Sequence, residues 1–154
     1  VRSDIRSIVE RSLLTLPAPE HITVEIDYTG DTVAELDRDQ IIQVMINLIS
    51  NAYGAMPGKG TLTITTGGDK SSITIKVSDT GAGIPKENLN KIFEPFFSTK
   101  QIGKGTGLGL AVTYGIVKMH YGDIKVTSNT DPAAGPTGTT FTVTLPRNGR
   151  NGDS

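Results

Sequence analysis

The chain contains no cysteine, which excludes disulfide bonds, thiolate zinc sites and cysteine nucleophiles. Its two histidines, His21 and His120, are far apart in the sequence, which argues against a histidine-rich metal site. No apolar run approaches the roughly 20 residues that a membrane helix requires. The sequence after Val1 is polar, unlike a secretory signal peptide. These absences indicate an ordinary globular domain.

Neither acidic nor basic residues predominate in the chain. The formal net charge is −1, with acidic and basic residues mixed along the chain. A protein held on duplex DNA by phosphate contacts is expected to be strongly basic, so we expect no nucleic-acid partner. A length of 154 residues suits one domain with one core. The conspicuous abundance is 18 glycines, which are clustered and therefore indicate specified loops.

Apolar residues at helical spacing predict helices in three stretches. They span residues 4–16, capped by Ser3 or Asp4 and ended by Pro17; residues 37–55, started by Asp37; and residues 107–120. A further short helix is expected after Pro85. The third long helix is predicted to bury Leu108, Val112, Ile116 and Met119.

Alternation of apolar and polar residues predicts strands over residues 22–28, 62–64, 73–77, 124–128 and 139–145, the second and third forming a hairpin. Such alternation indicates a sheet with one packed and one solvated face, whereas a doubly wound parallel sheet would show continuous apolar strands. We therefore predict a two-layer α/β sandwich: a mixed, mostly antiparallel sheet of about five strands with the long helices on one face. The folded domain would span residues 1–146, followed by a flexible tail over residues 147–154.

Two asparagines, Asn47 and Asn51, are four residues apart in the second predicted helix and therefore share one of its faces. Gln43 extends this polar stripe by one turn, away from the apolar face. Carboxamide oxygens are hard, neutral ligands that suit Mg²⁺, and their neutrality matters if a triphosphate binds the same metal. Taken alone, two asparagines more often mark a solvated polar face, so the metal site is a hypothesis.

A second candidate segment, Asp79-Thr80-Gly81-Ala82-Gly83-Ile84-Pro85, directly follows a predicted strand. The carboxylate can present a fixed hydrogen-bond acceptor, for example to the amine of adenine. The glycines would let a flat ligand approach the backbone closely. The alternative is an ordinary turn in which the aspartate caps the backbone.

Residues 93–100, Phe-Glu-Pro-Phe-Phe-Ser-Thr-Lys, contain three of the four phenylalanines of the chain. Such a dense aromatic segment beside a glycine-rich loop suggests the anchor of a hinge or lid, or equally a local hydrophobic cluster. The glycine-rich loop, residues 103–110, runs into the third predicted helix. Free backbone N–H groups and the helix dipole at such a start favour anions, and Lys100 and Lys104 add positive charge.

Several well-known motifs are absent. A Walker A motif needs Ser or Thr after its lysine, but Lys59 and Lys104 are both followed by glycine. The H-R-D and D-F-G elements of eukaryotic-type protein kinases and the G-x-S-x-G nucleophile turn of hydrolases do not occur.

Taken in order, N-x-x-x-N, D-x-G-x-G, F-E-P-F-F and G-x-G-x-G-L-G-L resemble the N box, first glycine box, F box and second glycine box of the ATP-binding catalytic domain of bacterial sensor histidine kinases. The boxes span residues 43–110, and the flanking elements fit as well. The wider superfamily includes DNA gyrase, mismatch-repair ATPases and the large heat-shock chaperones. The resemblance implies their shared Bergerat-type ATP-binding fold, with ATP and Mg²⁺ as ligands.

The resemblance also implies residue roles. Asn51 would be the principal Mg²⁺ ligand, with Asn47 in support, and Asp79 would accept the adenine amine. The pocket and the phosphate side would be formed by Gly81, Gly83, Ile84, Gly105, Thr106, Gly107, Leu108, Gly109 and Leu110. Lys100 and Lys104, in a lid over residues 94–106, would reach the phosphates and, with the two asparagines, act in catalysis. Thr139 would place a strand hydroxyl near the adenine.

The sequence departs from the ATP-hydrolysing members of the superfamily at Asn47. Those members carry a glutamate at this position as the base for the attacking water, and an amide cannot accept that proton usefully. The resemblance therefore implies a site that holds ATP while a histidine on a separate dimerisation domain supplies the nucleophile. No helical histidine motif precedes the N box here, and we assign His21 and His120 to surface structure. The chain is thus expected to be a catalytic fragment without its phosphoacceptor.

The implied partners are ATP, the histidine-containing dimerisation domain of the same kinase and, through the full-length protein, a response regulator. We expect no direct membrane contact from this fragment and a cytoplasmic location, as the cytosolic part of a sensor that could itself be membrane-anchored. Two alternatives stay open at this point: a serine kinase of the anti-sigma-factor type, and a nucleotide-sensing module without transfer activity.

Overall fold

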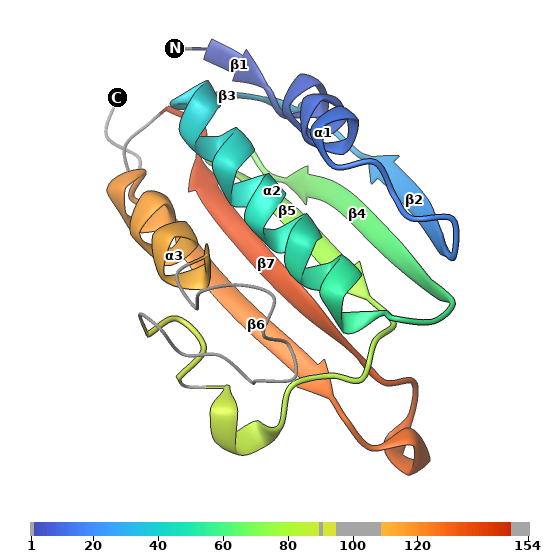
Figure 1. The fold of residues 1–154 in the computed structure, drawn as a ribbon. Coiled ribbons are helices and arrows are strands. Elements are labelled where there is room, and N and C mark those ends of the chain that lie inside the picture. The colour runs from blue at the N-terminus through green and yellow to red at the C-terminus, as the bar shows by residue number, and fades with distance from the viewer. Residues whose placement is uncertain (1, 90, 95–108, 149–154) are drawn as a thin grey trace.

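A computed structural model of the chain describes residues 2–89, 91–94 and 109–148. The described part forms two layers, with three helices packed on one face of a five-stranded sheet (Figure 1). The predicted two-layer α/β sandwich is therefore confirmed. Helix α2 crosses the middle of the sheet, with α1 on one side of it and α3 on the other.

The large sheet has the strand order β2-β4-β5-β7-β6. Strands β2 and β4 are parallel, and every other neighbouring pair is antiparallel, as predicted. The strands are β2 (Ile22–Tyr28), β4 (Gly60–Gly68), β5 (Ser72–Asp79), β6 (Asp123–Asn129) and β7 (Gly138–Pro146). Burial alternates along β4, β5 and β7, so one face is covered by helices and the other carries mostly threonine and serine side chains.

A second, two-stranded sheet was not predicted. Strand β1 (Arg2–Asp4) pairs with β3 (Val33–Glu35) in antiparallel register. Each strand has only three residues, too few to show a period of two in the sequence. Their pairing closes the N-terminal end of the domain beside α1 (Figure 1).

The first two long helices begin as expected. Helix α1 (Ile5–Thr15) is capped by Asp4, whose side chain accepts the N–H of Arg6. Helix α2 (Arg38–Ala55) is capped by Asp37, whose carboxylate accepts the N–H of Gln40. Such caps satisfy N–H groups that have no partner within the helix. Two short 3₁₀ helices, η1 (Lys86–Asn88) and η2 (Pro132–Ala134), lie in the loops, and the first is the one expected after Pro85.

The buried face of helix α3 (Gly109–Met119) differs from the prediction. Thr113, Ile116 and Val117 are buried, whereas Val112 is 45% and Met119 is 67% exposed. Ile116 is thus confirmed as a core residue, the two others are wrong, and Leu108 lies outside the described residues. Thr113 faces α2, where its hydroxyl accepts a hydrogen bond from Asn47. The buried face of α3 is therefore shifted by about one residue from the predicted one.

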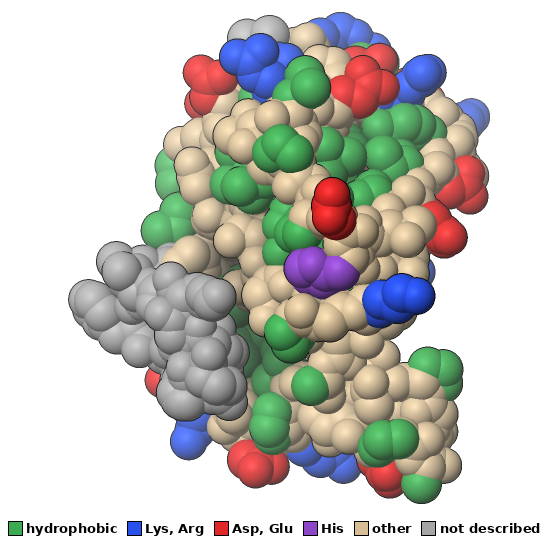
Figure 2. All heavy atoms as spheres, turned by 45° about the vertical axis from the view of Figure 1, so that its right-hand side comes forward, with side chains coloured by type: hydrophobic (Ala, Val, Ile, Leu, Met, Phe, Trp, Pro, Cys, Tyr) green, Lys and Arg blue, Asp and Glu red, His purple; other side chains and the backbone are tan. Residues whose placement is uncertain are grey.

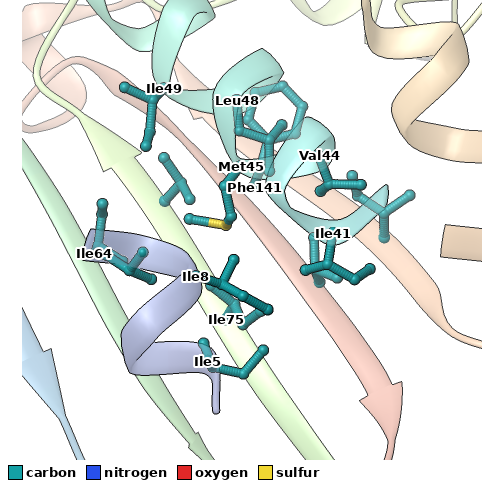
Figure 3. Close-up of a cluster of buried hydrophobic side chains, with 14 of the residues drawn as sticks. Ile5, Ile8, Ile41, Val44, Met45, Leu48, Ile49, Ile64, Ile75 and Phe141 are labelled. Atoms are coloured by element: carbon teal, nitrogen blue, oxygen red, sulfur yellow. The ribbon is translucent and has the colours of Figure 1, made fainter. Parts of the chain in front are cut away.

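Aliphatic side chains fill the space between the helices and the sheet. Ile5 and Ile8 of α1, several residues of α2 and the inward side chains of β4, β5 and β7 meet in one cluster (Figure 3). Met45 and Leu48 of α2 lie at its centre and are at most 1% exposed. Burying such side chains contributes about 1.5–3 kcal/mol each, which holds α2 rigidly on the sheet. The site residues on α2 therefore sit on a fixed support.

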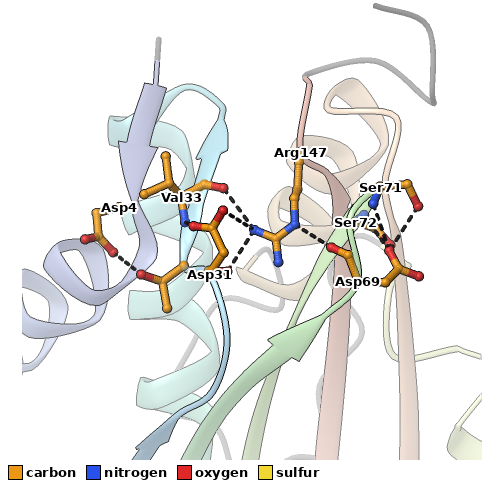
Figure 4. A network of polar contacts seen from close by, with 8 residues as sticks. Asp4, Asp31, Val33, Asp69, Ser71, Ser72 and Arg147 are labelled. Atoms are coloured by element: carbon orange, nitrogen blue, oxygen red, sulfur yellow. Dashed lines mark hydrogen bonds and ion pairs between the residues drawn. The ribbon is translucent and has the colours of Figure 1, made fainter.

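Arg147 lies one residue beyond the predicted end of the folded domain and belongs to its body. Its guanidinium donates hydrogen bonds to the carbonyl oxygens of Asp69 (2.6 Å), Asp31 (2.8 Å) and Val33 (3.0 Å) (Figure 4). These three residues come from the β4–β5 turn and from the segment that leads into and begins β3. One side chain, 11% exposed, thus ties the last strand to both, at the end of the sheet remote from Asp79.

Candidate ATP-binding site

One face of α2 carries Asn47, Asn51 and Ala55, each four residues after the last. Its neighbours differ along its length. At Asn47 it meets the beginning of α3, and at Ala55 it meets Gly81 in the turn after β5. Asn51 lies one helical turn from each contact. The structure therefore places Gly81 of the first glycine-rich segment on one side of Asn51 and Gly109, at the beginning of α3, on the other.

Both polar atoms of the Asn47 carboxamide form hydrogen bonds with neighbouring residues. Its oxygen accepts a hydrogen bond from Nε2 of Gln43 (2.9 Å). Its nitrogen donates to the carbonyl oxygen of Gly109 (3.0 Å) and to the hydroxyl of Thr113 (3.1 Å). A carboxamide oxygen has a second lone pair, so a supporting metal contact remains chemically open to Asn47 and stays a prediction.

Asn51 differs from Asn47 in its surroundings. The residue is exposed, and its carboxamide has no hydrogen-bond partner among the described residues. Asparagine is a poor helix former, which makes a mid-helix position costly by a few tenths of a kcal/mol against alanine. An exposed oxygen held on a rigid helix is suited to binding a hard cation, and the role of Asn51 as the principal metal ligand stays a prediction.

Asp79 is the last residue of β5 and pairs with Thr139 of β7 across the ladder. Its Oδ1 accepts the N–H of Gly81 at 2.8 Å. Burial raises the pKa of the Asp79 carboxyl, and the N–H groups of Gly81 and Thr139 lower it by smaller amounts. The result is a half-buried, oriented acceptor, which is the chemistry required to bind the amine of adenine.

The backbone at the two glycines of the Asp79 turn, Gly81 and Gly83, is tightly enclosed by neighbouring backbone. A Cβ on Gly81 would lie 2.3 Å from the carbonyl oxygen of Ala55, at the end of α2. A Cβ on Gly83 would lie 2.3 Å from the carbonyl oxygen of Asn129, at the end of β6, and Gly83 also has φ +87°. The turn is therefore wedged between α2 and β6, and only glycine fits at these two positions.

Ser128 of β6 is a site-supporting residue that the sequence reasoning missed. Its hydroxyl accepts the N–H of Ile84 (2.7 Å), donates to the carbonyl oxygen of Gly138 (3.0 Å) and lies 2.9 Å from the hydroxyl of Thr139. Thr139 is 5% exposed. Ser128 thus fixes Ile84 and Thr139, two predicted site residues, next to each other. Only the β6–β7 register reveals this, because Ser128 has no motif around it.

Phe93, the first residue of the F box, packs against Tyr114 of α3 and Phe141 of β7, with ring centroids 5.4 Å and 6.3 Å away. It therefore joins the body of the domain. Nine predicted site or F-box residues lie outside the described residues: Pro95, Phe96, Phe97, Lys100, Lys104, Gly105, Thr106, Gly107 and Leu108. Gly109 and Leu110 are described as the first two residues of α3.

Comparison with known proteins shows the family of the chain. Residues 36–149 match the family described as histidine kinase-, DNA gyrase B-, and HSP90-like ATPase. The chain belongs to this family. Membership implies that the domain binds ATP, and the candidate site is the one built by α2, the Asp79 turn and the start of α3. The matched residues include all of these elements.

The similar sequences belong to sensor kinases and sporulation kinases. The chain is 39% identical over 153 residues to the sensor kinase CckA of Brucella abortus, covering 89% of this chain and 16% of that protein. It is 42% identical over 127 residues to sporulation kinase A of Bacillus subtilis, covering 82% of this chain and 20% of that protein. The chain thus spans no more than a fifth of the length of either relative and corresponds to the ATP-binding domain of such sensor kinases.

Solved structures give the same assignment. The mycobacterial sensor histidine kinase MprB superposes with a TM-score of 0.85 at 28% identity, covering 96% of this chain and 97% of that one. Histidine kinase ThkA in complex with the response regulator protein TrrA superposes with a TM-score of 0.79 at 26% identity, covering 97% of this chain and 42% of that one. These similarities confirm the resemblance to sensor histidine kinases and favour it over the anti-sigma-factor type.

Acidic and basic side chains are interspersed over the face shown in Figure 2. Within residues 2–89, 91–94 and 109–148, no helix is both long and apolar enough to cross a bilayer.

Proposed function

We propose that this domain binds ATP with Mg²⁺ and donates the γ-phosphoryl group to a histidine on the dimerisation domain of a longer kinase. The observation that supports this most is the α2 face, where Asn51 lies between the Asp79 turn and the start of α3. An adenine acceptor, a neutral metal ligand and a glycine-rich helix start are the three parts that such a nucleotide needs.

The described residues divide the binding between them. Asp79 would accept the adenine amine, with Thr139 and Ser128 holding the pocket in shape. Asn51 would hold the metal ion, which would offset the negative charge of the phosphates. Catalysis would then rest on positioning and charge stabilisation, with Lys100 and Lys104 proposed as the phosphate-side cations.

The nucleophile has to come from outside the described site. Asn47, an amide, occupies the position where ATP-hydrolysing relatives are expected to carry a base. His120 uses both ring nitrogens, toward the Ile116 carbonyl oxygen (2.9 Å) and the Asp37 N–H (3.1 Å). In the proposed transfer an imidazole nitrogen forms an N–P bond while the bond from the γ-phosphorus to the bridging oxygen breaks. ADP leaves, and the ring loses one proton to a base or to water.

Further partners follow from this proposal. A response regulator would receive the phosphoryl group from the phosphorylated histidine of the full-length protein. Because ATP is supplied in the cytoplasm, the domain would work there. We also propose that the domain occupies residues 1–146, with Arg147 added to its body by the contacts described above.

Phosphotransfer in trans tests the function. The isolated chain with ATP and Mg²⁺ is expected to show negligible self-labelling, and adding the helical dimerisation domain from the parent protein is expected to produce acid-labile phosphohistidine on that domain. Strong labelling of His120 in the isolated chain would contradict the proposal. Phosphoserine on an added partner, with no phosphohistidine, would instead favour the serine-kinase alternative.

Asn51→Ala is expected to remove most of the Mg²⁺ dependence of nucleotide binding. Losing one charge-assisted polar contact corresponds to roughly a tenfold or larger drop in affinity in the presence of Mg²⁺. Titration calorimetry with ATP, with and without Mg²⁺, measures this directly. Ser50→Ala, at the exposed neighbouring position of α2, is the matched control and should behave as wild type. Equal Mg²⁺ dependence in Asn51→Ala and wild type would refute the metal assignment.

A further inference from the structure

Helix α3 runs antiparallel to the first half of α2 and is attached to it at two points. Near its beginning, Gly109 and Thr113 accept hydrogen bonds from Asn47 of α2. Just after its end, His120 accepts the N–H of Asp37, the residue that caps α2. Figure 1 shows α3 beside α2 over the same sheet face. Helix α3 is therefore attached to α2 by these side-chain hydrogen bonds as well as by apolar packing.

The orientation of the Asn47 carboxamide follows from its partners. The carbonyl oxygen of Gly109 can only accept, so the Asn47 atom that faces it is the nitrogen, which donates. The same nitrogen donates its second hydrogen to the hydroxyl of Thr113, which is 0% exposed. The oxygen is then left for Gln43. The contact with Gly109 requires an amide at this position, because a carboxylate would have no hydrogen to donate to a carbonyl oxygen.

The other attachment is also oriented. The ring of His120 donates from Nδ1 to the carbonyl oxygen of Ile116, because that oxygen can only accept. Nε2 of His120 then accepts the N–H of Asp37 at 3.1 Å. His120 thus holds the end of α3 at the beginning of α2. With that end held, the contact at Asn47 sets where α3 begins along α2.

We propose that Asn47 is a positioning residue whose amide nitrogen, acting through Gly109 and Thr113, fixes the beginning of α3 beside Asn51. The inference rests on the proposed function, because the position of α3 relative to Asn51 matters for binding only if both contact the same nucleotide. A solvated polar face would not account for the fully buried Thr113 hydroxyl, which is placed on α3 where the apolar pattern predicted none. Asparagine at this position therefore supplies a hydrogen-bond donor, in addition to being unable to act as a general base.

Removing the Thr113 hydroxyl tests the proposal while leaving Asn47 and Asn51 intact. Thr113→Val keeps the volume of the side chain and deletes the acceptor, whereas Thr113→Ser keeps the hydroxyl. We expect Thr113→Val to weaken binding of a non-hydrolysable ATP analogue with Mg²⁺ by about fivefold, the equivalent of one hydrogen bond. Thr113→Ser should restore the affinity to within about twofold of wild type.

A hydroxyl deletion on the other side of α2 separates positioning from stability. Tyr53 donates to the carbonyl oxygen of Leu16 at 2.8 Å, on the side of α2 that faces α1. Tyr53→Phe is expected to lower the thermal midpoint by an amount similar to Thr113→Val but to leave nucleotide affinity unchanged. In a double-mutant cycle, Asn47→Ala and Thr113→Val should be non-additive, since both break the same bond.

Three results would overturn the inference: unchanged affinity in Thr113→Val, an equal loss in Tyr53→Phe, or additive effects of Asn47→Ala and Thr113→Val. Each of these presupposes that the wild-type chain binds the nucleotide. Failure of the wild-type chain to bind would be a different result, because it removes the proposed function and with it the purpose of the positioning. Calorimetry of the wild-type chain is therefore the first arm of the experiment.

Discussion

Replacing Asp79 by asparagine is expected to weaken ATP binding by roughly 10- to 100-fold, since a hydrogen bond to a charged group contributes about 1.5–3 kcal/mol. The preference for ATP over GTP should narrow as well, because an asparagine side chain can donate to the carbonyl of guanine. Competition binding of the two nucleotides measures both effects. Asp27→Asn, which removes an exposed carboxylate from edge strand β2, is the control and should leave both unchanged.

A second measurement compares the pH dependence of ATP binding and of stability between the wild-type chain and Asp79→Asn. Burial raises the pKa of Asp79, so protonation should weaken ATP binding at a higher pH than an ordinary aspartate, with pKa about 3.9, would produce. Protonation of Asp79 should weaken ATP binding but stabilise the fold. The neutral carboxyl is favoured in the fold, so its contribution is present below the unfolded pKa and lost as pH rises through the raised folded pKa. Asp79→Asn should flatten both profiles, and identical profiles would contradict the assignment.

Gly83→Ala is expected to abolish measurable ATP binding and to lower the free energy of unfolding by at least about 2 kcal/mol. Two causes add. A left-handed φ of +87° costs an alanine about 1–2 kcal/mol, and the new Cβ would lie 2.3 Å from the backbone of Asn129. The turn carrying Asp79 would then have to move away from β6. Thermal unfolding and calorimetry on the same sample measure the two effects.

Gly30 offers a control that carries only the first cause. It has φ +68°, and a Cβ there would meet nothing within 4 Å. Gly30→Ala should therefore cost about 1–2 kcal/mol of stability and leave ATP affinity unchanged. If Gly83→Ala is no worse than Gly30→Ala in stability and retains binding, the turn is not wedged as the structure shows it.

Periodicity predicted most of this fold because the domain is built from long, regular elements. Helix α2 starts after Asp37 and ends at Ala55 as expected, since a capping aspartate precedes the apolar stripe and Pro57-Gly58 follows it. The large sheet followed from alternation alone. The paired strands β1 and β3 did not, because three residues carry no period and their partners are far apart in the chain.

The candidate site was predictable where a motif is local, and less so where it depends on packing. Asp79 and Gly81 are two residues apart, and their contact could be anticipated from the turn. The role of Ser128 depends on strand register, and that of Thr113 on which face of α3 meets α2. The apolar pattern of α3 placed Val112 in the core and gave no sign that a threonine would be buried instead.

A crystal structure of this chain with a non-hydrolysable ATP analogue and Mg²⁺ tests the central claim most directly. The account predicts the adenine amine within hydrogen-bond distance of the Asp79 carboxylate, the metal ion bound by the Asn51 carboxamide oxygen, and the phosphates toward the beginning of α3. A nucleotide bound on another surface, or one whose adenine and metal ion contact neither Asp79 nor Asn51, would contradict it.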